Sequence, residues 1–122
     1  MRNEKLQMDN QIEARSFEFA VRTVNLYKHL KSTNKEFDLF RQILRSGTSI
    51  GANVKEAQMA QSRADFCAKM YIALKEANET QYWLRLLHRT SYINDVEYES
   101  MKKDIDEIVS LLVAITKTTK TK

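Results

Sequence analysis

The chain of 122 residues contains no proline, two glycines and one cysteine. Without proline, and with Gly47 and Gly51 close together, it lacks the residues that usually mark turns and separate strands. Residues that favour helices, such as Ala, Leu, Glu, Lys, Gln and Arg, are spread throughout. The composition therefore predicts an all-α protein, and the length fits a single domain over residues 1–122.

The small numbers of cysteine and histidine argue against disulfides and metal sites. Cys67 is the one cysteine, so no intramolecular disulfide can form, and His29 and His88 have no clustered acids or thiols beside them to hold a metal. The sequence brings no nucleophile and base together in a recognisable motif. We therefore expect no cofactor, no metal and no enzymatic activity.

Long hydrophobic runs are also missing. No segment approaches the roughly 20 apolar residues that cross a bilayer. Residues 1–10 are polar and lack the apolar segment of a signal peptide. The expected location is the cytoplasm, with no membrane partner.

The charge is unevenly distributed along the chain. The formal net charge is +4, and residues 31–90 hold ten Lys or Arg against six Asp or Glu. Residues 95–115 instead hold two lysines against six acids. Any basic surface should therefore belong to the middle of the chain.

Apolar residues recur at helical spacing in four segments, at about residues 11–30, 36–60, 63–89 and 95–116. In the first segment the apolar stripe is Phe17, Ala20, Val24 and Tyr27. The links between segments are short, which favours antiparallel neighbours. The pattern predicts an antiparallel up-and-down four-helix bundle followed by a disordered tail at residues 117–122.

Two of the links carry helix-capping signals. Ser62 precedes Asp65 by three residues, and Asn94 precedes Glu97 by the same spacing. In such a pair the first side chain accepts a backbone N–H and the acid complements the helix dipole. We therefore place the starts of the third and fourth helices directly after Ser62 and Asn94.

The third segment has more apolar surface than one face of a helix requires. Besides its main apolar side, Ile72, Trp83, Leu86 and Leu87 spread around the helix. The surplus indicates a second buried contact, most simply with another copy of the chain. Scattered exposed apolar residues are the simpler alternative.

Aromatic and basic residues alternate along the remaining side of this helix. Such a row can stack nucleobases and neutralise phosphates. The alternative is a solvated or subunit-facing row whose bases meet acids, for instance those of the fourth helix. The residues are Tyr71, Lys75, Asn78, Tyr82, Arg85 and Arg89.

The second helix carries a polar arc and the two glycines. We expect Arg45 and Glu56 to share one charge-assisted network with the polar residues between them, which would fix the register of the bundle. Gly47 and Gly51 favour a close crossing with another helix, and the alternative is a kink near residues 46–51. The arc consists of Gln42, Arg45, Ser49, Asn53 and Glu56.

The segment from Gln42 to Ala57 resembles the family of four-helix bundle proteins encoded in intervening sequences of bacterial 23S rRNA genes. The resemblance is strongest at Arg45, Ser49-Ile50, Asn53 and Glu56. It continues through Phe66, residues 72–80 and Trp83-Leu84, and covers about 100 residues.

The resemblance implies an antiparallel four-helix bundle that assembles into a five-subunit ring. The family that the chain resembles has a related branch, the accessory variability proteins of diversity-generating retroelements, which form such a barrel with a basic surface that binds nucleic acid and a reverse transcriptase. We therefore expect a non-catalytic, homopentameric accessory protein that associates with RNA or DNA, RNA above all. The competing expectation is a ring that acts as a protein–protein scaffold without nucleic acid.

Overall fold

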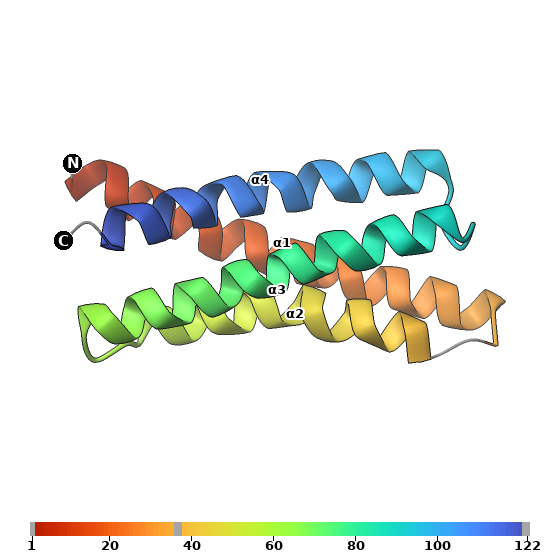
Figure 1. The fold of residues 1–122 in the computed structure, drawn as a ribbon, viewed down its shortest axis with the longest axis horizontal. Coiled ribbons are helices and arrows are strands. Elements are labelled where there is room, and N and C mark those ends of the chain that lie inside the picture. Colours follow the sequence, from red (N-terminus) through yellow and green to blue (C-terminus); the bar gives the residue numbers. More distant parts are fainter. Residues whose placement is uncertain (1, 36–37, 121–122) are drawn as a thin grey trace.

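The computed structural model describes residues 2–35 and 38–120, with side chains for residues 7–35 and 38–118. It contains four helices: α1 (Arg2–Thr33), α2 (Asp38–Gln58), α3 (Arg63–Arg89) and α4 (Asp95–Lys120). Figure 1 shows that successive helices run in opposite directions. Each helix packs against two others: α1 against α2, α2 against α3, α3 against α4, and α4 against α1. The predicted antiparallel four-helix bundle is confirmed.

The helix ends differ from the expected ones mainly at the two ends of the chain. The helix α1 starts at Arg2 rather than near residue 11, because Met8 and Ile12 lie one turn apart and both pack on the core. The predicted disordered tail at residues 117–122 is wrong for residues 117–120, which continue α4. The last core residues of α4, Ile115 and Thr116, are buried and anchor that final turn. Residues 36–37 and 121–122 lie outside the described residues.

Both predicted caps are present. Ser62 has an extended backbone at the start of α3, and its Oγ accepts the Asp65 N–H at 3.0 Å. At the start of α4, Asn94 and Glu97 form a reciprocal pair in which each side chain accepts the other's backbone N–H at 2.8 Å. These caps satisfy N–H groups that the first turn of a helix leaves without partners.

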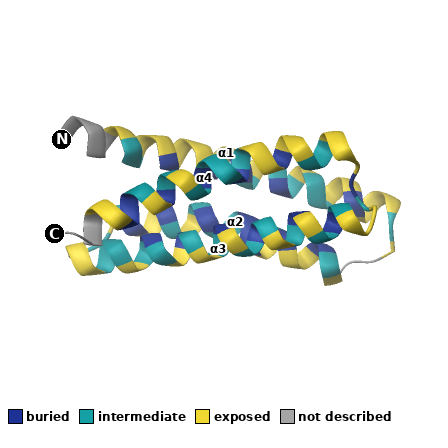
Figure 2. Cartoon of the chain, turned by 45° about the horizontal axis from the view of Figure 1, so that its top comes forward, coloured by how far each residue is buried: buried dark blue, intermediate teal, exposed yellow. Residues whose placement is uncertain are grey.

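The core face of α1 differs from the expected one. Phe17, predicted inside, is 65% exposed, and the fully buried line contains the polar residues Ser16 and Thr23. Their hydroxyls donate to carbonyls of their own helix, those of Glu13 and Phe19. Because Ser16 and Thr23 are polar, a search for apolar residues at helical spacing does not find the buried face of α1. The buried residues of α1, visible as dark blue segments in Figure 2, are Ile12, Ser16, Phe19, Thr23 and Leu30.

The glycines of α2 explain why the core line of α1 is small. A Cβ on Gly47 would lie 2.7 Å from Oγ1 and Cγ2 of Thr23, and one on Gly51 would lie 3.3 Å from the Ser16 carbonyl oxygen. The helix α2 continues unbroken from Asp38 to Gln58. The predicted close crossing is therefore confirmed, and the alternative of an interrupted helix is wrong.

The other side of α2 is packed by small residues as well. Ser46 and Thr80 of α3 are both fully buried, and their hydroxyl oxygens lie 2.9 Å apart. Thr80 Oγ1 also lies 2.8 Å from the Glu76 carbonyl, so both hydroxyls are satisfied inside the core. The middle of α2 is thus held closely between α1 and α3.

The close crossing at Gly47 should reverse the usual stabilising effect of replacing a helical glycine with alanine. A Gly→Ala change inside a helix ordinarily stabilises it by about 1 kcal/mol. We expect Gly47→Ala to destabilise the protein instead, by about 1–3 kcal/mol, because the new methyl overlaps Thr23. Urea unfolding would measure this. Adding Thr23→Ala should restore part of the loss, and a Gly47→Ala variant more stable than the wild type would contradict the close crossing.

Candidate nucleic-acid interface

The predicted row of aromatic and basic residues lies on the outward side of α3. Lys75, Tyr82, Arg85 and Arg89 are exposed, while Tyr71 is half-buried. Near the carboxyl end of the helix the row borders a hollow of about 380 Å³, lined by Tyr82, Arg85, Leu86, Arg89 and Thr90. The structure therefore brings three of the six residues of the row, Tyr82, Arg85 and Arg89, around one concave surface, and the other three lie further along the helix.

The bases of this row have no acidic partner among the described residues. Lys75, Arg85 and Arg89 form no ion pair with an acid in the part of the chain that the structure describes. Four acids of α4 have other partners: Asp104 pairs with Arg22 and Glu107 with Arg15 across the seam with α1, while Asp106 contacts Lys102 and Gln81 and Asp95 contacts His88. The expected alternative, in which acids of the fourth helix neutralise the row, is not what these contacts show.

The predicted network between Arg45 and Glu56 is wrong in its partners. Arg45 pairs with Glu76 and Glu79 of α3, and Glu56 pairs with Lys69 of α3 at 3.0 Å. Arg45 and Glu56 are eleven residues apart, about 16 Å along a helix, so each lies nearer to an opposite charge on α3 than to the other. The polar arc joins α2 to α3 in two places.

The remaining members of the arc bond within their own helix. Ser49 Oγ donates to the Arg45 carbonyl at 2.7 Å, and Asn53 Nδ2 donates to the Ser49 carbonyl at 2.8 Å. Gln42 is exposed. These contacts satisfy polar groups at the edge of the bundle.

One network was not apparent in the sequence. Trp83 Nε1 donates to Glu79 Oε2 at 2.9 Å, and the same carboxylate oxygen accepts from Arg45. The Arg45 guanidinium also donates to Glu76 Oε1 at 3.1 Å. Glu79 and Trp83 are four residues apart, so their pairing could be proposed from helical spacing. The contact of Arg45 with Glu79 could not be proposed from the sequence, because it depends on how α2 and α3 are aligned.

The network favours the charged forms of its members. The hydrogen bond from Trp83, followed by that from Arg45, lowers the pKa of Glu79. The hydrogen bond to Glu79 raises the pKa of Arg45. A carboxylate that accepts two donors is stabilised in its ionised state, so this pair stays charged over the whole neutral range.

Two further features bear on the kinds of site the protein carries. Across the described residues there is no group of three or more His, Cys, Asp and Glu side chains arranged to hold a metal ion. None of the helices, as far as they are described, is long and apolar enough to cross a membrane.

The Glu79 pair predicts a specific pH dependence. Because folding lowers the pKa of Glu79, its carboxylate stabilises the folded state above the ordinary glutamate value of about 4.5, and this contribution is lost as the pH falls through the lower folded pKa. We expect Glu79→Gln to be less stable than the wild type at neutral pH and the difference to shrink below about pH 4.5. Urea midpoints across this range would test it, with exposed Glu18→Gln as the control. A difference independent of pH would contradict the ionic contribution.

Comparisons with known proteins agree with the fold. The sequence model of the family described as 23S rRNA-intervening sequence protein matches residues 8–114. Among solved structures, a protein of unknown function from the S23 ribosomal protein family of Bacteroides thetaiotaomicron VPI-5482 is 61% identical. The match covers 90% of this chain and 98% of that one, with a TM-score of 0.88. A comparison with curated proteins gives no match. The chain therefore belongs to the family of 23S rRNA-intervening sequence proteins.

Proposed function

We propose that the protein is a non-catalytic, oligomeric accessory protein of the cytoplasm that associates with nucleic acid, above all with RNA. The observation that supports this most directly is the row on α3, where Lys75, Arg85 and Arg89 have no acidic partner among the described residues and Tyr82 is 58% exposed. Positive side chains hold phosphates and exposed aromatic rings stack on bases, so the row suits binding and needs no bond-making chemistry.

The distribution of acids supports the same proposal. Asp104 and Glu107 are paired with arginines of α1 at the seam between α1 and α4, so these two acids do not neutralise the row. In the bundle α1 lies diagonally opposite α3 and makes no contact with it. Two other acids of α4 contact α3, Asp106 through Gln81 and Asp95 through His88, but neither pairs with Lys75, Arg85 or Arg89.

A second candidate function, a ring that serves as a protein–protein scaffold, is favoured by an apolar groove elsewhere. Phe17 and Val21 of α1 are exposed to 65% and 40%, and Phe17 lines a groove of about 520 Å³ between α1 and α2. Exposed apolar surface of this kind commonly marks a contact between proteins. The groove also supports the oligomeric part of the leading proposal, on a different helix from the one expected. Its walls are formed by Glu13, Ser16, Phe17, Ala20, Thr48, Gly51, Ala52 and Lys55.

Salt-dependent binding to a structured RNA tests the leading proposal. We expect the double variant Arg85→Ala/Arg89→Ala to bind more weakly at low salt. The slope of log affinity against log salt should fall by about 1.4, because two phosphate contacts are lost at about 0.7 each. The matched control is Lys28→Ala/Lys35→Ala, which removes the same charge from exposed positions outside α3. If both double variants lose affinity equally, net charge explains binding and the row does not.

Light scattering on two variants separates the candidate functions. Phe17→Asp should lower the mass of the assembly without unfolding the chain, because the side chain is mostly exposed. Tyr82→Asp should leave the mass unchanged if the row faces solvent, as nucleic-acid binding requires. Dissociation of the Tyr82→Asp variant would place the row between subunits and favour the scaffold.

A further inference from the structure

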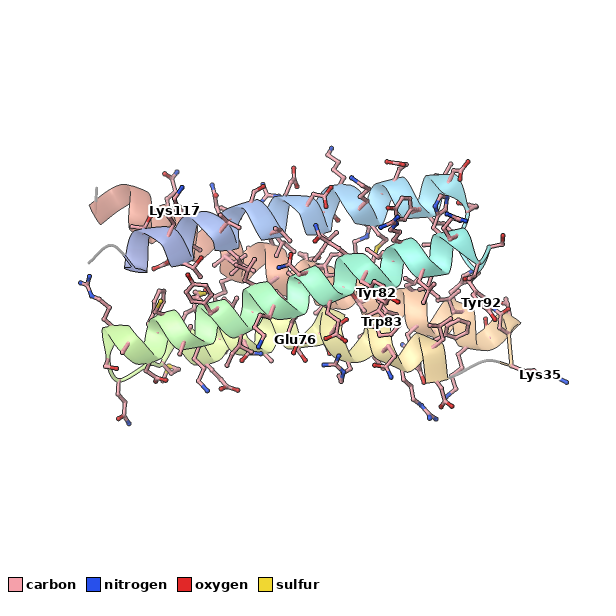
Figure 3. The ribbon with its side chains drawn as sticks, viewed as in Figure 1. Lys35, Glu76, Tyr82, Trp83, Tyr92 and Lys117 are labelled. Carbon is pink, nitrogen blue, oxygen red and sulfur yellow. The ribbon has the colours of Figure 1, made fainter. Side chains whose placement is uncertain are left out.

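Tyr82 is exposed, and its ring also contacts a neighbouring aromatic ring. Its ring meets that of Trp83 edge to face, with centroids 5.0 Å apart and planes at 74°. Figure 3 shows the two side chains together on the same stretch of α3. An exposed tyrosine ordinarily exchanges between rotamers, and a neighbouring ring in this geometry favours one of them. The ring of Tyr82 is thus exposed to solvent, and its contact with Trp83 favours one orientation.

Trp83 is itself anchored. Its indole N–H donates to Glu79 at 2.9 Å, and Glu79 is bound by Arg45 from α2. Arg45 also pairs with Glu76 at 3.1 Å, so the guanidinium is fixed at two carboxylates. Contacts between ionised partners are stronger than neutral hydrogen bonds. A chain of contacts therefore runs from α2 through Glu79 and Trp83 to the ring of Tyr82.

On its exposed side Tyr82 borders the hollow of about 380 Å³ with Arg85, Leu86, Arg89 and Thr90. This volume lies at the small end of the range for ligand sites, roughly 300–1,000 Å³. Thr90 Oγ1 donates to the Leu86 carbonyl at 2.7 Å, which satisfies that acceptor at the end of the helix. The polar groups left for a ligand are mainly the two guanidinium groups, beside one aromatic ring and one apolar side chain.

We propose that this hollow binds a single unpaired nucleotide of an RNA strand, with its base stacked on Tyr82 and a phosphate held by Arg85 and Arg89. Trp83 is the positioning residue that keeps Tyr82 in the stacking orientation. The proposal rests on the proposed association with RNA and names the form of RNA that is bound. In a duplex the base faces are covered by their neighbours, so only a splayed-out base can use an exposed tyrosine.

The preference for unpaired RNA can be measured with a fluorescently labelled single strand and the duplex of the same sequence. The single strand should bind more tightly and should also change the emission of Trp83, the only tryptophan of the chain. Tyr82→Leu should weaken binding of the single strand roughly 5- to 100-fold, the range expected for loss of one base stack. Tyr82→Phe keeps the ring and should bind like the wild type, and neither variant should change duplex binding.

A double-mutant cycle tests the positioning role. Trp83→Ala should weaken binding of the single strand roughly 2- to 10-fold, because ordering an exposed side chain then opposes binding. Its salt dependence should stay unchanged, since no phosphate contact is removed. In the Tyr82→Leu background the same change should have no further effect. Equal losses in both backgrounds would instead show a general structural role and overturn the positioning role.

The outcomes distinguish this proposal from the one it rests on. If the wild type binds neither the strand nor the duplex at low salt, both proposals fail. If it binds both equally and Tyr82→Leu changes nothing while Arg85→Ala/Arg89→Ala still weakens binding, the protein associates with RNA through phosphates alone. The unpaired-nucleotide site is then wrong and the proposed function stands.

Discussion

The close approach of α2 to its neighbours is the constraint on which the rest of the structure depends. Gly47 faces Thr23 and Gly51 faces Ser16, with no room for a Cβ on the first glycine. On its other side α2 meets Thr80 of α3 through the buried hydroxyl of Ser46. Glycine inside a helix is destabilising relative to alanine by roughly 1 kcal/mol. The close packing that these small residues allow offsets this cost and fixes how far each helix can slide along the next.

That alignment decides which charges meet. With Ser46 opposite Thr80, the adjacent Arg45 comes within reach of Glu76 and Glu79. A shift of one helical turn, about 5.4 Å, would separate these groups and leave the Trp83 indole bonded to a carboxylate without its basic partner. The position of Tyr82, which packs on Trp83, thus depends on a core contact made by Thr80, two residues earlier in α3.

Paired and unpaired charges lie on different parts of the bundle. Asp104 and Glu107 of α4 pair with Arg22 and Arg15 of α1, and Lys75, Arg85 and Arg89 of α3 remain without acidic partners among the described residues. A surface of one sign raises the local concentration of oppositely charged partners and is weakened by salt. These three bases without acidic partners, rather than the net charge of +4, are the reason for proposing α3 as the side that meets an anionic polymer.

The helical class, the four segments, both caps and the close crossing at the glycines could be predicted from the sequence, because these features depend on local spacing and on side-chain size. The sequence also singled out the row on α3, since residues on one side of a helix follow from 3.6 residues per turn. The partners of Arg45 and Glu56, the outward position of Phe17 and the hollow beside Tyr82 became apparent only in the folded chain. Each of these depends on the alignment between helices, and that alignment arises from packing across the core, which spacing along a single helix does not contain.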